Sequence, residues 1–173
     1  MIAAAALAVL AAGCTPNEEG RPQPVQTSDA SPSSVSPGGS PAGFGDLKSC
    51  DLLDKALEGQ GYPASEADNI GSSNGCSTNK FGSAMSLNLD DKQGVDDLAA
   101  DPSKAYDGKI NGRRIRQVKE IDGSEATCLV LLEVSAKARA MVSVTLGTQG
   151  STDQACDDAF SVAQAVEPQL PKA

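Results

Sequence analysis

Histidine and tryptophan are both absent from this 173-residue chain, and aromatic residues make up only 3% of it. The lack of His removes the commonest general base, the commonest metal ligand and the usual partner of a Ser or Cys nucleophile. With so few aromatics, any core must consist mainly of aliphatic side chains, and covalent cross-links would help to stabilise such a lean core. The composition therefore argues against most hydrolase chemistry, and we expect no enzyme activity, no cofactor and no metal.

Basic residues are also scarce. The chain has 14 Lys and Arg against 23 Asp and Glu, which gives a formal net charge of -9. A body with this balance is repelled by nucleic-acid phosphates and by anionic lipid headgroups. We therefore expect no nucleic-acid partner, and we interpret the acidic surface as a means of keeping an exported protein soluble.

The first twelve residues form an uncharged apolar run that is too short to span a bilayer, which takes about 20 residues. Its length is typical of the apolar region of a signal peptide. The run ends in Leu10-Ala11-Ala12-Gly13-Cys14, which resembles the lipobox of bacterial lipoproteins, although Ala11 stands where Leu is favoured and the segment contains no Lys or Arg. We predict a signal peptide at 1–13, a lipidated Cys14 and attachment to the extracytoplasmic face of the cell membrane.

The chain has five cysteines, and an odd number in an exported protein leaves one unpaired. Lipidation of Cys14 would account for the odd one; a free thiol or an intermolecular bridge is the alternative. The other four, Cys50, Cys76, Cys128 and Cys156, can pair in three ways, and the sequence does not choose among them. We favour Cys50 with Cys76 and Cys128 with Cys156, because each bond would join a helix to a neighbouring strand.

Residues 14–45 are dominated by Pro, Ser, Gly, Gln and Thr, and six of the ten prolines lie between Pro16 and Pro41. Almost no apolar side chain is present to offset the entropy of ordering the backbone. We predict a disordered tether that acts as a spacer between membrane and domain. The alternatives are a linker needed only for solubility and a docking site for a proline-binding module.

Residues 46–173 have the hydrophobic patterns of one α+β domain. Apolar spacing predicts a helix over 50–57 and a short helix over 95–100, and Ser151 with Gln154 marks the start of a last helix. Alternating or continuous apolar runs predict strands over 83–89, 113–121, 127–134 and 138–146. Asn111-Gly112 is typical of a hairpin turn, and the last two strands should pair antiparallel at the centre of the sheet. We predict a small antiparallel sheet covered by helices and stapled by two disulfides.

These residues resemble a family of actinobacterial envelope lipoproteins that share a domain of unknown function. The resemblance lies in the opening Cys50-Asp51-Leu52-Leu53, in Cys76 and Cys128, and in a closing helix from Ala155-Cys156 to Leu170-Pro171. It covers residues 46–173, with Ser77 where an aromatic residue often follows the second cysteine. The resemblance implies a location and an architecture, and it supplies no catalytic residue.

Two kinds of charged cluster are candidates for function. One is basic and forms a possible anion-binding patch for wall polymers or an acidic partner: Arg113, Arg114, Arg116 and Lys119, with Lys109 nearby. The structural alternative is that these charges protect a strand edge. The acidic pairs at 90–91, 96–97 and 157–158 lack the spacing of a calcium loop, and we interpret them as solvated carboxylates.

Together these features predict a monomeric cell-envelope lipoprotein whose domain is a non-enzymatic binding or interaction module. The alternative is a wall-modifying hydrolase that uses carboxylates without His. A deep cleft with two facing carboxylates of raised pKa would favour the enzyme. A shallow apolar pocket or an exposed patch would favour binding.

Overall fold

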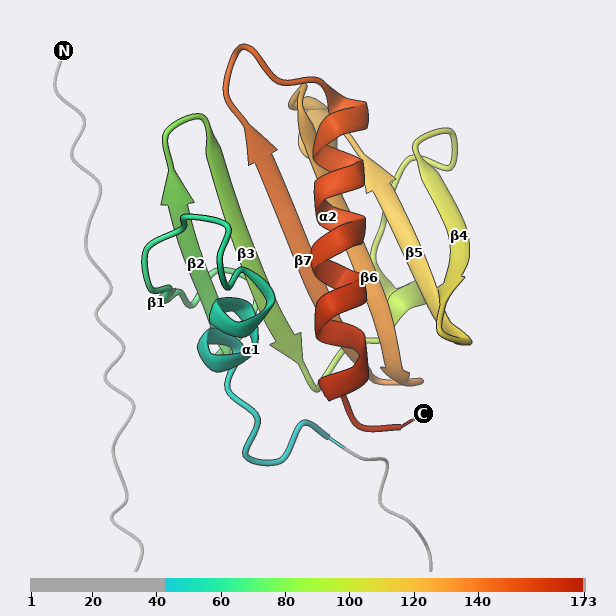
Figure 1. Cartoon of the computed structure of the whole chain (residues 1–173). Coiled ribbons are helices and arrows are strands. Elements are labelled where there is room, and N and C mark those ends of the chain that lie inside the picture. Colours follow the sequence, from blue (N-terminus) through green and yellow to red (C-terminus); the bar gives the residue numbers. More distant parts are fainter. Residues whose placement is uncertain (1–42, 173) are drawn as a thin grey trace, which may run out of the picture. The chain divides into compact units, whose positions relative to one another are not determined.

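A computed structural model describes residues 43–172 of the chain (Figure 1). The predicted signal peptide, Cys14 and the tether as far as residue 42 lie outside the described residues. The described part is an α+β domain with one antiparallel sheet, as the sequence predicts, and the sheet has seven strands. No helix in residues 43–172 is long and apolar enough to cross a membrane.

The sheet runs in the order β1-β2-β3-β7-β6-β5-β4, and each pair of neighbours is antiparallel. Its strands are β1 (Glu66–Ala67), β2 (Gly75–Lys80), β3 (Ser83–Asp90), β4 (Ala105–Ile110), β5 (Arg113–Lys119), β6 (Thr127–Ser135) and β7 (Ala138–Leu146). The predicted pairing of the two apolar strands is confirmed, since β6 and β7 are neighbours near the middle of the sheet. Because β3 lies in one half of the sheet and β4 at the edge of the other half, the connection between them has to cross the sheet.

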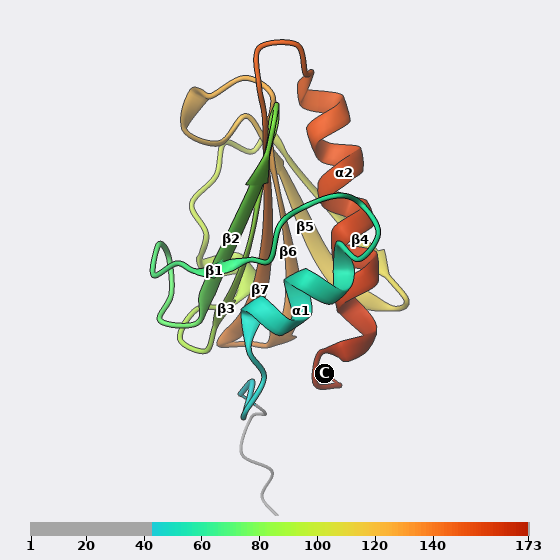
Figure 2. The same cartoon turned by 60° about the vertical axis from the view of Figure 1, so that its left-hand side comes forward.

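Helices α1 (Ser49–Ala56) and α2 (Thr152–Val166) pack on the same face of the sheet, as the side view shows (Figure 2). The predicted start of α2 is confirmed: the hydroxyl of Ser151 accepts a hydrogen bond of 3.1 Å from the Gln154 backbone N–H. A short 3-10 helix, η3 (Glu167–Gln169), follows α2 and contains Pro168. This proline lacks a backbone N–H, so it fits the first turn of η3 but not the interior of a longer helix.

The main core lies between the sheet and the two helices. Its fully buried members come from every layer, and include Leu53, Leu87, Val130, Leu132, Val142, Val144, Ala159 and Val166. The two disulfides run through this layer. One joins Cys50 of α1 to Cys76 of β2 and the other joins Cys128 of β6 to Cys156 of α2, which is the pairing that we favoured.

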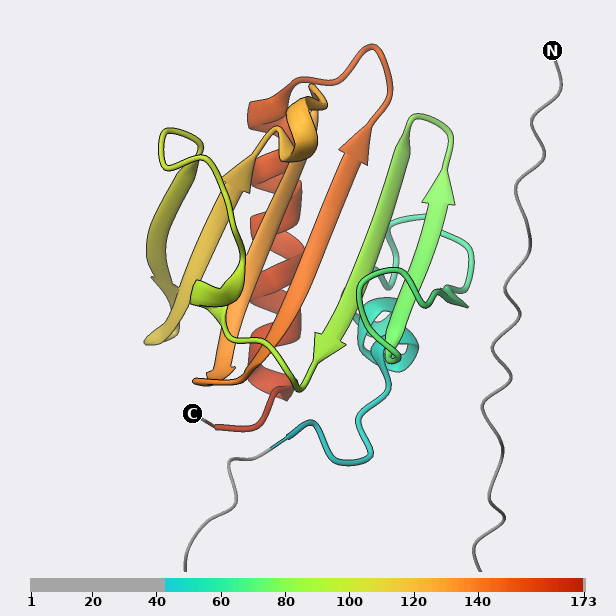
Figure 3. The ribbon, with the colours of Figure 1, turned by 180° about the vertical axis from the view of Figure 1, so that it is seen from behind.

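The expectation that helices cover the sheet holds for one face only. On the other face, the β3–β4 connection lies across the sheet in an irregular path (Figure 3). Where the sequence predicts a helix over 95–100, the connection forms only the three-residue 3-10 helix η1 (Val95–Asp97). Leu98 is already extended, so the helix ends after one turn and the remaining residues of the predicted helix, 98–100, continue without helical structure toward β4.

The domain also begins slightly earlier than its composition indicates. Phe44, which we assigned to the tether, is only 6% exposed and belongs to the main core. The Leu47 N–H donates to the Phe44 carbonyl, which closes a turn that leads into α1. The buried Phe44 side chain and this turn join the segment to the domain, although the Gly and Pro residues around Phe44 are typical of a linker.

Candidate functional site

The β3–β4 connection is held on the sheet by polar contacts at its start. The Arg139 guanidinium donates to the Gly94 carbonyl at 2.9 Å and to the Gln93 side chain at 2.6 Å. The Gly94 N–H in turn donates to Asp97 at 2.8 Å, and Lys137 pairs with the same carboxylate at 3.2 Å. A Cβ at Gly94 would lie 2.3 Å from the Ala136 carbonyl oxygen, so this close approach requires glycine.

Beneath the connection lies a second, smaller apolar cluster. Val95 is 1% exposed and packs on Val118, Leu129, Leu131 and Met141, which come from β5, β6 and β7. This cluster explains why β6 is apolar on both faces: one set of its side chains meets the helices and the other meets the connection.

Next to this cluster the surface is hollowed into a shallow cleft of about 430 Å³. Its apolar walls are formed by the connection on one side and by β5 with the following turn on the other, namely Leu98, Ala100, Val118 and Ile121. Charged side chains stand around it: Asp101, Lys104, Lys119 and Glu120. A cavity of this size lies within the range that small-molecule sites occupy, roughly 300–1,000 Å³.

The charges at the rim are arranged in pairs. Lys104 lies 2.7 Å from Glu120, and Lys119 lies 2.7 Å from Asp153 of α2. These hydrogen bonds raise the pKa of both lysines and lower the pKa of Glu120 and Asp153. A ligand with an anionic group would therefore meet cations that already have acidic partners and would have to compete with them.

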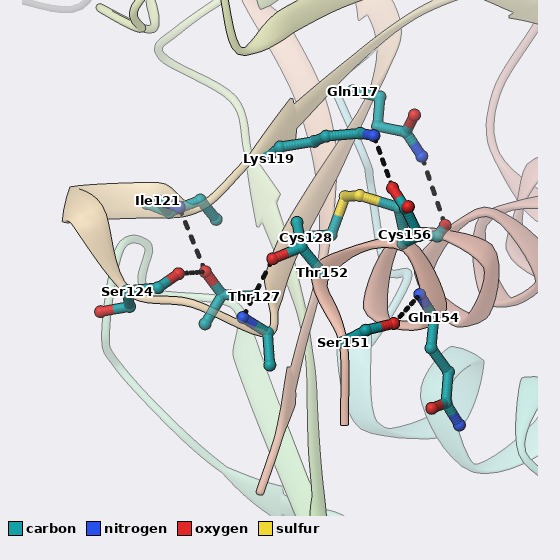
Figure 4. Close-up of a disulfide and its surroundings, with 12 residues drawn as sticks. Gln117, Lys119, Ile121, Ser124, Thr127, Cys128, Ser151, Thr152, Gln154 and Cys156 are labelled. Carbon is teal, nitrogen blue, oxygen red and sulfur yellow. Dashed lines mark hydrogen bonds and ion pairs between the residues drawn. A yellow bond between two sulfur atoms is a disulfide. The ribbon is translucent and has the colours of Figure 1, made fainter. Parts of the chain in front are cut away.

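The wall at Ile121 depends on the second disulfide and its neighbours (Figure 4). Glu120 adopts the left-handed conformation, with φ 48°, which ends β5 and begins the turn η2 (Ile121–Gly123). The Thr127 hydroxyl accepts from the Ile121 N–H at 3.1 Å and donates to the Ser124 carbonyl at 2.6 Å. Since Thr127 precedes Cys128, the bond to Cys156 and the turn that walls the cleft are fixed together.

A second hollow of about 250 Å³ adjoins the same connection. Leu98 and Ala100 line both hollows, and the second is completed by Pro102, Ala105, Asp107 and Arg116. Leu98 and Ala100 thus contribute to two neighbouring depressions. Neither hollow is predicted from the sequence, because both arise where a connection crosses strands far from it along the chain. The signal in the sequence was Val95 and Leu98, two large aliphatic residues three apart in a segment with no other large aliphatic side chain.

The predicted basic patch is divided by the alternation of β5, so it is not the single surface that we expected. Arg113 faces the helix side and is 8% exposed; its Nε donates to Glu167 at 2.9 Å. Arg114 and Arg116 face the opposite side, where Arg114 binds Asp96 through two hydrogen bonds of 2.7 Å and Arg116 binds Asp107 at 3.0 Å. With Lys119 bound to Asp153, all four cations have acidic partners, and β5 is an inner strand rather than the edge.

Two of the three acidic pairs of the sequence contain residues with basic partners. Asp96 and Asp97 pair with Arg114 and Lys137, and the buried Asp90 lies 3.6 Å from Arg139. Asp157 is exposed on α2. In the part of the chain that the structure describes, no three His, Cys, Asp or Glu side chains are grouped so that they could hold a metal ion.

Fold and site together define a small α+β domain: one antiparallel sheet, helices on one face, two disulfides, and a shallow cleft on the other face. A family model described as a protein of unknown function, DUF3558, matches residues 9–169, and the chain belongs to this family. No curated protein and no solved structure matched the chain.

Proposed function

We propose that this protein is a cell-envelope lipoprotein, anchored on the extracytoplasmic face of the membrane by lipid on Cys14 after removal of residues 1–13. The observation that carries the proposal is the pairing of the cysteines. Four of the five are bonded to each other inside the domain, and Cys14 is left at the end of an apolar leader. Disulfides persist in exported proteins and are rare in the cytosol. The family match begins at residue 9 and so includes Cys14.

We further propose that the domain works as a non-enzymatic binding module through the cleft beside the β3–β4 connection. Two observations support this. The cleft has apolar walls and a charged rim, which suits a small amphiphilic ligand. In residues 43–172, each carboxyl group whose pKa departs clearly from its ordinary value is shifted downward, whereas a hydrolase that relies on carboxylates needs one whose pKa is raised.

Replacing the anchoring cysteine tests the first part of the proposal. The wild-type chain should sediment with membranes and require detergent for release, whereas Cys14→Ser should be recovered in the soluble fraction. The physical reason is that two acyl chains hold a protein stably on a bilayer, and the acidic domain offers no electrostatic substitute. Cell fractionation followed by immunoblotting measures the distribution.

A high-salt wash of the wild-type membranes is the control for attachment by charge, and it should release nothing. Equal distribution of wild-type and Cys14→Ser protein would refute the anchor.

Blocking the cleft tests the second part. Anilinonaphthalene sulfonate, an apolar anion, should bind to the wild-type domain and gain fluorescence. Ala100→Trp places a large side chain in the cleft and should abolish most of this gain. Ala84→Trp, which adds the same side chain on an exposed position of β3, is the matched control and should bind dye as the wild type does. Equal dye binding by Ala100→Trp and wild type, with both folded by circular dichroism, would exclude the cleft as the site.

A further inference from the structure

The two edges of the sheet differ in what they offer to another strand. At one edge β1 has only two residues, so it presents little backbone. At the other edge β4 has six, and four of them, Tyr106 to Lys109, are exposed. Helix α2 lies over the middle of the sheet and leaves β4 uncovered (Figure 1). An exposed strand of this length presents a row of backbone donors and acceptors with which another chain can pair.

The hairpin turn determines which backbone groups of β4 point outward. Asn111 and Gly112 both have positive φ, 49° and 88°, as in a two-residue type I′ turn. Such a turn makes Ile110 and Arg113 a hydrogen-bonded pair, so even-numbered residues of β4 bond to β5. The Lys119 N–H donates to the Lys104 carbonyl at 2.9 Å, which continues the even-numbered series. The N–H and C=O groups of residues 105, 107 and 109 therefore face away from the sheet.

The charges on these outward residues select one partner and one register. Consider two β4 strands that pair antiparallel about a twofold axis at Gly108. Asp107 of one copy then lies opposite Lys109 of the second copy, and Lys109 of the first lies opposite Asp107 of the second. Both members of each pair are odd-numbered, so their free backbone groups meet. An axis at residue 107 would place the two copies of Asp107 opposite each other, and an axis at residue 109 would place the two copies of Lys109 opposite each other. Like charges directly opposite are destabilising.

The surroundings of the two charges fit this register. Lys109 is exposed, has no ion pair in the described residues, and lies opposite Arg114 on β5, a like charge. Asp107 is oriented on the same face by Arg116 at 3.0 Å and Arg114 at 3.7 Å, yet its side chain is 55% exposed. On the helix side, Tyr106, which is 51% exposed, would lie opposite Ile110 of the second copy. Pairing would thus give Lys109 an acidic partner and cover an exposed aromatic side chain.

We propose that β4 is an edge at which two copies of this chain pair antiparallel about Gly108, joining their sheets into one. This inference goes beyond the anchor and the cleft and replaces the expectation of a monomer. Alternatively, the charges on β4 prevent pairing of this edge. In that case the protein would be a monomer at every concentration.

A charge exchange tests the register. The experiments use the full chain with Cys14→Ser, so that neither lipid nor the Cys14 thiol contributes to association. Alone, Asp107→Lys places Lys opposite Lys, and Lys109→Asp places Asp opposite Asp, so each should weaken the dimer Kd by about tenfold. A mixture of the two variants restores two opposite-charge pairs and should dimerise like the wild type. Lys92→Asp, the same charge change on an exposed loop, is the control and should leave the Kd unchanged. Sedimentation velocity measures each Kd.

A cross-link tests the axis independently. Gly108 would face its counterpart in a pair without hydrogen bonds, where Cα atoms lie about 4.5 Å apart, within reach of a disulfide. A Cβ at Gly108 meets only Ile115, at 3.6 Å, so Gly108→Cys should fold and form a covalent dimer on mild oxidation. Ala105→Cys, on the same strand, should not, because its two copies would lie about 20 Å apart. A wild-type chain that stays monomeric, a dimer indifferent to charge exchange, or equal cross-linking by both cysteine variants would overturn the proposal.

Discussion

Replacing Cys128 and Cys156 together by Ala should lower the free energy of unfolding by about 3–4 kcal/mol. The bond closes a loop with a sequence separation of 28, and opening it lets the unfolded chain regain the corresponding conformational entropy. This loss is a large share of the 5–15 kcal/mol that a typical domain has. Urea unfolding followed by circular dichroism measures the loss.

The same variant should also loosen the cleft. Thr127 holds the turn that carries Ile121, and the Gln117 side chain donates to the Cys156 carbonyl at 3.3 Å, so the bond lies between two contacts that shape this end of β5 (Figure 4). Replacing Cys50 and Cys76 instead, with a similar separation of 26, should cost a similar free energy and leave dye binding in the cleft intact. Loss of less than about 1 kcal/mol from either pair would contradict this account of the stability.

The second large effect concerns the ion pair between Arg113 and Glu167. Glu167 is 8% exposed and accepts hydrogen bonds of 2.9 Å from Arg113 and from the Asn111 side chain. Glu167→Ala leaves the guanidinium buried without its counter-ion, and we expect a loss of about 3–5 kcal/mol in the free energy of unfolding. Replacing both residues by Leu should cost less than Glu167→Ala alone, because no charge is then left buried. A larger loss in the double variant would refute this explanation.

This pair should also show in the pH dependence of stability. The hydrogen bond from Asn111, with the contact to Arg113, holds the pKa of Glu167 below its ordinary value of 4.5. A carboxyl group whose folded pKa is depressed contributes stability that is present above 4.5 and is lost as the pH falls through the folded pKa. In Glu167→Gln this contribution is absent, so the difference in stability from the wild type should shrink as the pH falls below 4.5. A difference that stays constant or grows would contradict the assignment.

The sequence predicted the parts of the fold that depend on local chemistry. Ser151 with Gln154 marks a helix start because the hydroxyl satisfies a free N–H, and Asn111-Gly112 marks a hairpin because both residues tolerate positive φ. The apolar runs of β6 and β7 identified the centre of the sheet. In contrast, β2, with the polar sequence Gly75–Lys80, has no strand pattern of its own and owes its place to pairing with β3 and to the bond at Cys76.

The site was less predictable, because it depends on contacts between distant residues. The basic side chains of β5 are adjacent in the sequence, but strand alternation sends Arg113 to one face and Arg114 to the other. Their acidic partners, Glu167 and Asp96, lie on elements far away along the chain. No local pattern shows that residues 91–104 cross the sheet, and the cleft exists only because they do.

Export is the condition on which the anchor, the disulfides and the envelope function all depend. The most direct test is intact-mass and peptide analysis of the protein isolated without reduction from its native cells. We predict an N-terminus at Cys14 that carries acyl chains, and disulfide-linked peptides that join Cys50 to Cys76 and Cys128 to Cys156. A soluble protein with an unmodified Cys14 and four reduced thiols in the domain would contradict the account.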